Sequence, residues 1–347
     1  MGEPSGNNDR WLFRVASRPD QGGGHVRRCL VLSRALAPHA PSVIVLDKGA
    51  EDWLPTLQGV GQAAMIEGAE LEEAWAGSVL DGYDFSERYA RELSRRAAPL
   101  VVIDDLLAPP PGAHLVVNPA PGLTGCEIAG VAALVGPRYA LVDAHLSEPP
   151  PPVRERVGHV LVSFGLGDRN NVSCLAIEAL AILGAHGISP RVTVVLGATA
   201  PHLRTVREAI RRLGGRGELL VEVSDMIGLL RSVDLAIGAG GVSLLERMAA
   251  GVPSFSISVA ENQDRAVRGA STLGATRNLG SLSTLAPNRL AEHIGKLSED
   301  FAARSAMSGR ARRMVDGKGA VRVAAALLRL GDSMHCDSAS PGAQVIA

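Results

Sequence analysis

Four consecutive prolines, Pro149 to Pro152, set the organisation of this chain. Proline lacks a backbone N–H and has a fixed φ, so a proline run cannot join a helix or a central strand and forms a stiff spacer instead. The run divides most of the 347 residues into two halves, 1–150 and 151–331. The small, polar residues 332–347 are expected to form a flexible tail.

Short apolar runs alternate with amphipathic segments in both halves. The runs are nearly continuous in Val, Ile and Leu, which is typical of strands buried on both faces of a parallel sheet. They are residues 12–16, 43–46, 100–103, 115–117, 132–135, 160–164, 192–196, 219–223, 235–237 and 255–259. Segments of helical period, such as 28–36 and 172–183, lie between them. The pattern predicts an α/β fold of two Rossmann-like parallel-sheet domains facing one another across a cleft.

Composition excludes several functional classes. With 46% hydrophobic and 20% charged residues the chain is globular, and its net charge of −1 gives no general attraction to nucleic acid or anionic membranes. The polar N-terminus and the lack of a long apolar stretch predict neither a signal peptide nor a membrane span, so a cytoplasmic protein is expected. The four cysteines form no C-x-x-C pair, and neither a metal nor a cofactor is expected.

A glycine-rich turn, Gly22–Gly23–Gly24–His25, follows the first strand and precedes a helix. Such a turn lets the backbone approach a ligand and presents N–H groups to an anion. The positive end of the helix dipole disfavours imidazolium, so a neutral His25 can act as a base. One alternative is a plain loop with a surface histidine. The other is a dinucleotide-binding turn with Asp47 at the next strand end, although Arg27 occupies the place of its third glycine.

A second glycine-rich turn, residues 238–243, again joins a strand to a helix. Its backbone N–H groups and the Ser243 hydroxyl can cradle a pyrophosphate. Glu246, one turn further along, suits a ribose diol, because a carboxylate would repel phosphates; the alternative is a solvated helix charge. A third loop begins at Phe164–Gly165 after the first strand of the second half, where open α/β sheets bind ligands.

Polar side chains, Glu261, Asn262 and Gln263, follow the strand at residues 255–259. Amides at this place suit a sugar with hydroxyl or acetamido groups. The alternative is that Asn262 simply caps the helix that follows.

These motifs together resemble a known family over residues 10–330. The chain is similar to the hydrolases of pseudaminic-acid biosynthesis called PseG, which act on UDP-2,4-diacetamido-2,4,6-trideoxy-β-L-altropyranose and share their fold with the MurG-type GT-B glycosyltransferases. Residues 22–30 look like the family's G-x-G-H-x-x-R-C-L. The other matching segments are 81–83, 103–106, 136–141, 237–241, 246 with 251–253, and 260–263.

The resemblance implies a GT-B-like fold and a role for individual residues. The implied catalytic residues are His25, which would activate the attacking water, Tyr83 and Asn262. The pyrophosphate, the ribose and, through the backbone near Met226, the uracil would be bound by the second half. The implied substrate-binding residues are Gly22, Gly24, Arg28, Phe164, Gly165, Met226, Gly240, Gly241, Ser243, Glu246, Glu261 and Gln263.

The third loop departs from the family pattern. The family commonly reads F-G-G-S-D-P where this chain has F-G-L-G-D-R, so Leu166 and Arg169 replace a glycine and a proline. Asp84 stands where the family often has His. These changes bear on which sugar is bound.

The expected activity is hydrolysis of the anomeric C–O bond of a UDP-linked diacetamido-trideoxy sugar, with inversion and release of UDP. One alternative is a GT-B glycosyltransferase that uses a UDP-sugar donor. The other is a non-catalytic nucleotide-sugar binder or an NAD-dependent dehydrogenase.

Overall fold

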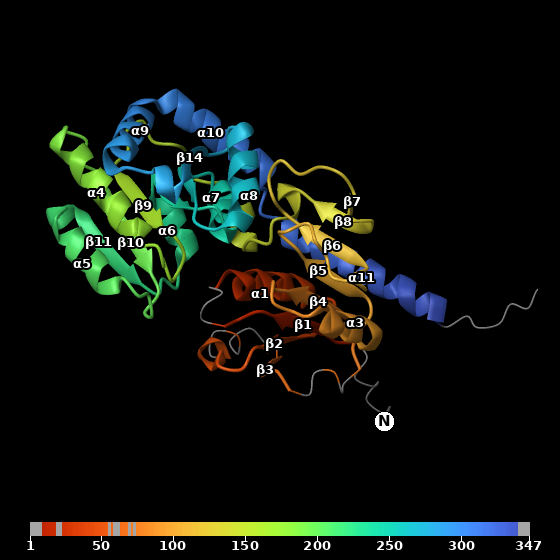
Figure 1. Cartoon of the computed structure of the whole chain (residues 1–347). Helices are drawn as coiled ribbons and strands as arrows, with labels where there is room; N and C mark the ends of the chain where they lie inside the picture. The colour runs from red at the N-terminus through yellow and green to blue at the C-terminus, as the bar shows by residue number, and fades with distance from the viewer. Residues whose placement is uncertain are drawn as a thin grey trace, which may run out of the picture. The chain divides into compact units, whose positions relative to one another are not determined.

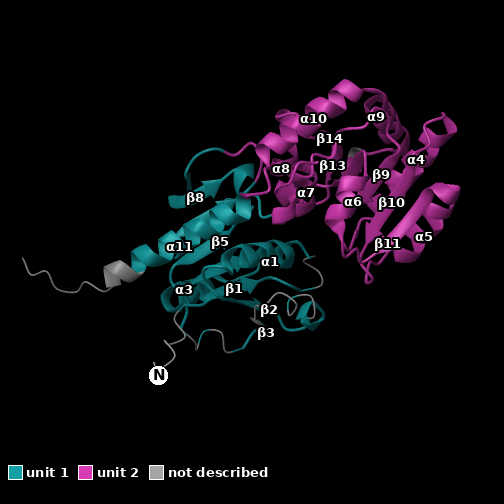
Figure 2. Cartoon of the chain, turned by 180° about the vertical axis from the view of Figure 1, so that it is seen from behind, with its two compact units in different colours: residues 1–119, 124–141, 319–347 teal, residues 120–123, 142–318 magenta. Residues whose placement is uncertain are grey.

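The chain forms two compact units, coloured separately in Figure 2. The computed structural model describes residues 9–18, 23–54, 57, 63–68, 71 and 74–338. Unit 1 contains the described residues of 1–119, 124–141 and 319–338, and unit 2 contains 120–123 and 142–318. Each unit is built on a parallel sheet, so the predicted pair of α/β domains is confirmed. Their arrangement across a cleft stays a prediction.

Unit 1 is built on an eight-stranded sheet in the order β3-β2-β1-β4-β5-β6-β8-β7. Its described neighbours are parallel except for β7 and β8, which are antiparallel. The strands are β1 Trp11–Val15, β2 Ser42–Leu46, β3 Ala63–Ile66, β4 Gly77–Asp81, β5 Leu100–Ile103, β6 Leu115–Asn118, β7 Glu127–Ile128 and β8 Val131–Val135. The strand order reverses between β1 and β4, which makes their carboxyl ends the switch point where such sheets bind ligands.

Helices cover both faces of the unit 1 sheet. They are α1 Gly24–Leu36, α3 Glu87–Arg96 and α11 Gly319–Ser338, with 3-10 turns at Glu51–Trp53 and Pro137–Tyr139. Helices α1 and α11 pack side by side (Figure 1). Alternate β1 residues Trp11 and Phe13 share a core with them, whereas Leu12 points to the face that α3 covers. This alternation follows from the two-residue period of a strand.

Unit 2 has a six-stranded parallel sheet in the order β11-β10-β9-β12-β13-β14. Its strands are β9 His159–Ser163, β10 Arg191–Leu196, β11 Gly217–Val221, β12 Leu235–Ala239, β13 Ser254–Ser258 and β14 Arg277–Ser281. Its helices are α4 Val172–Ala185, α5 Leu203–Arg211, α6 Met226–Ser232, α7 Val242–Ala249, α8 Glu261–Thr272, α9 Pro287–Glu299 and α10 Phe301–Met314, with 3-10 turns at Ala144–Ser147, Gly214–Arg216 and Leu282–Thr284. Here the switch point lies between β9 and β12.

The proline run belongs to unit 2, and two arginines of α10 explain why. Arg304 is fully buried and donates to the backbone carbonyls of Arg154 and Glu155. Arg312 donates to the carbonyls of Ser147 and Glu148. These contacts fix the chain on both sides of the prolines to α10. The division between the units therefore lies between residues 141 and 142, before the predicted boundary at 150.

The second difference concerns the end of the chain. Residues 319–331 were expected in the second half and 332–347 as a tail, but α11 belongs to unit 1 and continues through Ser338. The reason is burial, since Val323 and Leu327 on α11 have no exposed surface. Residues 339–347 lie outside the described residues. Within the described ranges, no helix is long and apolar enough to cross a membrane.

Several elements were not predicted from the sequence, and β4 is the most consequential. Its sequence Gly-Ser-Val-Leu-Asp has a short apolar run, although all five residues are buried. Strands β3 and β14 and helices α9 to α11 are further examples. The ten predicted strands all correspond to observed strands, with their ends shifted by up to two residues.

We expect Leu327→Ala to destabilise unit 1 by about 2–5 kcal/mol, because it removes a buried side chain from the core shared with α1. All three tryptophans, Trp11, Trp53 and Trp75, belong to unit 1, so urea unfolding followed by tryptophan fluorescence reports on this unit. Val321→Ala, at a position 55% exposed on the same helix, is the control and should shift stability by less than about 0.5 kcal/mol. Equal effects would contradict the packing of α11 in the unit 1 core.

Candidate functional site

A buried histidine–aspartate pair lies at the carboxyl edge of the unit 1 sheet. Val15 and Asp81, the last residues of β1 and β4, are neighbours in register, and α1 begins at Gly24. His25 Nδ1 lies 2.7 Å from Asp81 Oδ1, and both side chains are buried. An ionised carboxylate can only accept, so we assign the proton to Nδ1. Nε2 then carries the lone pair of a potential base.

Arg28, one turn further along α1, holds the same carboxylate with two hydrogen bonds. Its Nε donates to Asp81 Oδ2 and its Nη2 to Oδ1, each at 2.6 Å. Arg28 Nη2 also lies 3.3 Å from His25 Nδ1, and Asp81 Oδ1 is the acceptor common to both. Burial alone would raise the pKa of Asp81, but the charge of Arg28 and the hydrogen bonds from Arg28 and His25 hold it well below its usual range. Asp81 is therefore a fixed anion.

Tyr83 joins this group through a second carboxylate. Its hydroxyl donates to Asp105 Oδ2 at 2.7 Å, and Arg28 Nη1 donates to the same oxygen at 2.8 Å. The rings of Tyr83 and His25 meet edge to face, with centroids 4.9 Å apart. Tyr83 is 40% exposed although His25 is buried. The network thus connects α1 with the segments after β4 and β5, at the switch point of the sheet.

The neighbouring Asp104 has a different function. Its carboxylate accepts the backbone N–H groups of Leu106 and Ala108, each at 2.7 Å, and so shapes the turn after β5. Burial raises the pKa of Asp104, and the charge of Asp105 adds to this effect. Asp104 stabilises the turn, and Asp105 contacts the site.

The remaining predicted residues of this loop have simpler environments. Gly22 lies outside the described residues, and Gly24 is the first residue of α1. Asp47, on which the dinucleotide alternative depends, accepts the Ser17 N–H and pairs with buried Arg14, each at 2.7 Å. Its carboxylate is therefore engaged by groups of the unit itself.

In unit 2, the turn after β12 leads directly into α7. Gly241 precedes the helix, and in this described stretch no side chain caps the first turn. The first N–H groups of a helix have no partner within it, so this end suits an anion. Ser243 and Glu246 are half-buried on α7.

Gln263 braces this turn from α8. Its Oε1 accepts the N–H of Gly240 at 3.1 Å and that of Val259 at 3.2 Å. A Cβ at position 240 would lie 2.2 Å from Val267 Cγ2, so only glycine fits there. The side-chain oxygen of Gln263 already accepts these two hydrogen bonds. Only the N–H groups of its side-chain amide can therefore donate to a ligand.

Glu261 and Asn262 occupy the first turn of α8. Ala260 is the N-cap residue of this helix, so the alternative that Asn262 caps it is wrong. Glu261 is exposed and Asn262 is half-buried. Both lie at the carboxyl end of β13, the same edge of the sheet as the glycine turn.

The third loop and the start of α6 complete this edge. Phe164 is buried in the core, so it can offer a ligand only its backbone, and Gly165 has a φ of +88°. Asp168 accepts the N–H groups of Val172 at 3.0 Å and Ser173 at 2.9 Å, and so caps α4. Met226 is the first residue of α6.

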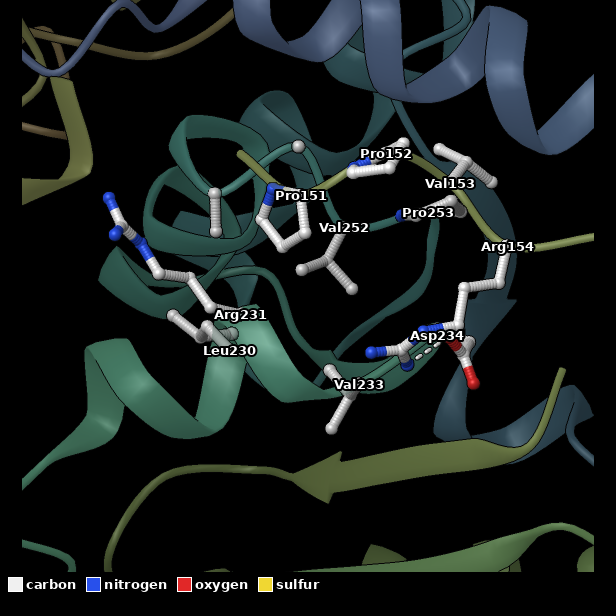
Figure 3. Close-up of a pocket in the computed structure, with 12 residues that line it drawn as sticks. Pro151, Pro152, Val153, Arg154, Leu230, Arg231, Val233, Asp234, Val252 and Pro253 are labelled. Carbon is white, nitrogen blue, oxygen red and sulfur yellow. Dashed lines mark hydrogen bonds and ion pairs between the residues drawn. The ribbon is translucent and has the colours of Figure 1, made fainter. Parts of the chain in front are cut away.

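A shallow pocket lies at the opposite edge of the unit 2 sheet, where β9, β12 and β13 begin (Figure 3). Pro151, Val233 and Val252 line it, together with the ion pair of Arg154 and Asp234 at 2.6 Å. It lies apart from the glycine turns and holds none of the predicted site residues. Within the described ranges, no three His, Cys, Asp or Glu side chains are grouped to hold a metal ion.

The motifs at residues 81–83 and 103–106 contain Asp81 and Asp105, but the sequence assigns neither of them a role. The structure brings both to His25, Arg28 and Tyr83. A signal was present, because each aspartate follows closely on a buried apolar run. Recognising it required the order β1-β4-β5, which brings these strand ends together.

Comparison with known proteins gives a partial sequence match and extensive structural matches. No protein-family model matches the chain. The spore coat polysaccharide biosynthesis protein SpsG of Bacillus subtilis (strain 168) is 34% identical over 134 residues, which cover 38% of this chain and 39% of that protein. The match therefore spans well under half of either protein.

Solved structures resemble nearly the whole chain. MurG of Acinetobacter baumannii has a TM-score of 0.63 at 11% identity, covering 93% of this chain and 99% of its own. TcCGT1 in complex with UDP has a TM-score of 0.67 at 12% identity, covering 93% and 100%. A putative UDP-N-acetylglucosamine 2-epimerase from Listeria monocytogenes has a TM-score of 0.64 at 14% identity, covering 98% and 100%. These likenesses confirm the GT-B-like fold.

We expect Asp81→Asn to destabilise unit 1 by about 3–5 kcal/mol at neutral pH, because it leaves the buried Arg28 without the buried carboxylate that accepts two of its hydrogen bonds. The pKa of Asp81 is lowered by folding, so its contribution is present above the unfolded value of about 3.9 and is lost as pH falls from there. Urea unfolding at a series of pH values should show the two proteins converging in acid.

Asp84→Asn provides the control for this substitution. Asp84 pairs with Arg18, but the two side chains are 59% and 49% exposed, so the change should cost less than about 1 kcal/mol. A gap between wild type and Asp81→Asn that stays constant down to the acid limit would contradict the buried ion pair.

Proposed function

We propose that this chain is a nucleotide-sugar hydrolase. It cleaves the anomeric C–O bond of a UDP-linked 2,4-diacetamido-2,4,6-trideoxy sugar and releases UDP and the free sugar with inversion. The observation that carries the proposal is the oriented His25–Asp81 pair at the switch point of unit 1. The partial similarity to SpsG, named for polysaccharide biosynthesis, and the GT-B-like fold support an enzyme that uses a nucleotide sugar. The motifs after each strand end support the hydrolase in particular.

In this reaction His25 is the general base. Its Nε2 takes a proton from water as the water oxygen attacks the anomeric carbon, and Asp81 stabilises the imidazolium that forms. Arg28 keeps Asp81 ionised and fixed, so the imidazole holds one tautomer and one orientation. In this mechanism His25 is the base and no carboxylate attacks the sugar, so attack opposite the leaving group gives inversion, as in inverting glycosidases.

The leaving group is UDP, which takes the electron pair of the broken C–O bond. A diphosphate is already a good leaving group and needs charge stabilisation more than protonation. The N–H groups of Gly240, Gly241 and the first turn of α7 supply that stabilisation, with the Ser243 hydroxyl. Glu246 binds the ribose hydroxyls, and the backbone near Met226 binds the uracil. Asn262 with Glu261 contacts the sugar.

A glycosyltransferase is the second candidate function. It is favoured by the structural likeness to MurG, because the MurG-type GT-B enzymes are glycosyltransferases. In that reaction His25 would deprotonate an acceptor hydroxyl in place of water. The cytoplasmic location remains part of the proposal, as a place where nucleotide sugars are consumed.

The first experiment is incubation with UDP-2,4-diacetamido-2,4,6-trideoxy-β-L-altropyranose without any acceptor, with UDP followed by anion-exchange chromatography. Wild type should release UDP. His25→Ala should lower turnover by roughly 10²–10⁴-fold, the contribution of a general base, and keep its affinity for UDP. His39→Ala, an exposed histidine just beyond the other end of α1, is the matched control and should retain full turnover. UDP release that requires an added acceptor would favour the glycosyltransferase.

Tyr83→Phe tests whether the hydrogen bond from Tyr83 to the Asp105 carboxylate contributes to the reaction. It keeps the ring against His25 but removes the hydroxyl that donates to Asp105, a bond to a charged group that is worth roughly 10- to 100-fold. We expect kcat to fall by about that factor while the affinity for UDP is unchanged. Tyr89→Phe, on the helix that covers the other face of the sheet, should leave kcat unchanged. A wild-type kcat for Tyr83→Phe would exclude its hydroxyl from the reaction.

A further inference from the structure

A buried arginine lies directly beneath the glycine turn of unit 2. Arg247, on α7, is 2% exposed. Its Nη2 donates to the Ala239 carbonyl at 2.8 Å and to Ser256 Oγ at 3.1 Å, and its Nη1 donates to Ser243 Oγ at 3.1 Å. The guanidinium therefore joins the end of β12, the first turn of α7 and strand β13.

The acceptors described for Arg247 are uncharged, namely a carbonyl and two hydroxyls. Its Nε is buried and has no acceptor within the described chain. Burial lowers the pKa of Arg247 to about 10, against the opposing effect of Glu246. Arg28 in unit 1 is equally buried but pairs with two carboxylates, Asp81 and Asp105. A buried cation with neutral partners is costly, and an anion bound nearby would offset that cost.

The bond to Ser243 also directs the hydroxyl of that residue. Because Ser243 Oγ accepts a hydrogen from Arg247, its own hydrogen must point elsewhere. Donation from a cation polarises the hydroxyl and makes it a stronger donor. Ser243 lies on the first turn of α7, where the backbone N–H groups also point outward and no described side chain caps the helix.

The residue before Ala239 makes this arrangement possible. A Cβ on Gly238 would lie 2.6 Å from Arg247 Nη1 and 2.5 Å from the Ser163 carbonyl oxygen. A Cβ cannot lie that close to a backbone oxygen, so position 238 requires glycine, and the missing side chain leaves room for the guanidinium under the strand end.

We propose that Arg247 is a positioning residue for the diphosphate of a nucleoside diphosphate, acting through its buried charge and through Ser243. This rests on the proposed function, because it assumes that the turn at residues 239–243 receives the phosphates of UDP. Arg247 does not touch the ligand itself. It adds a fixed positive charge beneath the turn and sets the Ser243 hydroxyl as a donor to the anion.

The test compares two ligands, UDP and uridine, by isothermal titration calorimetry. Arg247→Met keeps the length of the side chain and removes its charge. We expect it to bind UDP roughly 10- to 100-fold more weakly, the range for a lost interaction with a charged group, and uridine as well as wild type does. Arg304→Met removes another buried arginine of unit 2, one that donates to backbone carbonyls, and should leave the ratio of the two affinities unchanged.

Several results would overturn the proposal. Equal UDP affinity in wild type and Arg247→Met would do so, and so would a parallel loss of UDP and uridine binding, which indicates a merely structural role. If Arg247→Met does not fold, Arg247→Gln replaces it, with the same loss expected because the charge is again removed. A wild-type chain that fails to bind UDP would overturn this proposal together with the proposed function.

Discussion

The buried carboxylate of Asp81 is the group on which the site of unit 1 depends. It has no exposed surface, and it is surrounded by the side chains of His25 and Arg28 from a single turn of α1. Burying the charge of Asp81 or of Arg28 is unfavourable, and the pairing of the two, with the hydrogen bond from His25, offsets that cost. The position of α1 relative to the end of β4 is therefore fixed by charge as well as by apolar burial.

The two units are both built on a parallel sheet, but they differ in the charged groups at their switch points. Unit 1 places paired charges at its switch point, where Arg28 is neutralised by Asp81 and Asp105. Unit 2 places backbone N–H groups and the guanidinium of Arg247 at its own, where the described acceptors are neutral. An imidazole held by an ionised carboxylate suits proton transfer, and a site with surplus positive charge suits a phosphate. The proposed function assigns the two units those two tasks.

What the sequence could predict was local. Each glycine turn is recognisable from the strand pattern before it and the helix pattern after it, so His25, Gly240 and Ser243 could be identified from neighbouring residues alone. Asp81 could not, because its meaning comes from β4 lying beside β1, and 65 residues that include two other strands separate the ends of those two strands. Arg247 carries no signal in the sequence, since only the packing of α7 on β12 and β13 shows that it is buried.

The return of α11 to unit 1 has a consequence for how the protein is made. During synthesis the N-terminal part of a chain leaves the ribosome first, and domains generally fold as they emerge. All of unit 2 leaves the ribosome before residues 319–338. Until then, the apolar surface of unit 1 that Val323 and Leu327 cover in the folded protein stays exposed. The second unit in the sequence is thus the first that can finish folding, and the period in between is when the nascent chain is most open to chaperones and to aggregation.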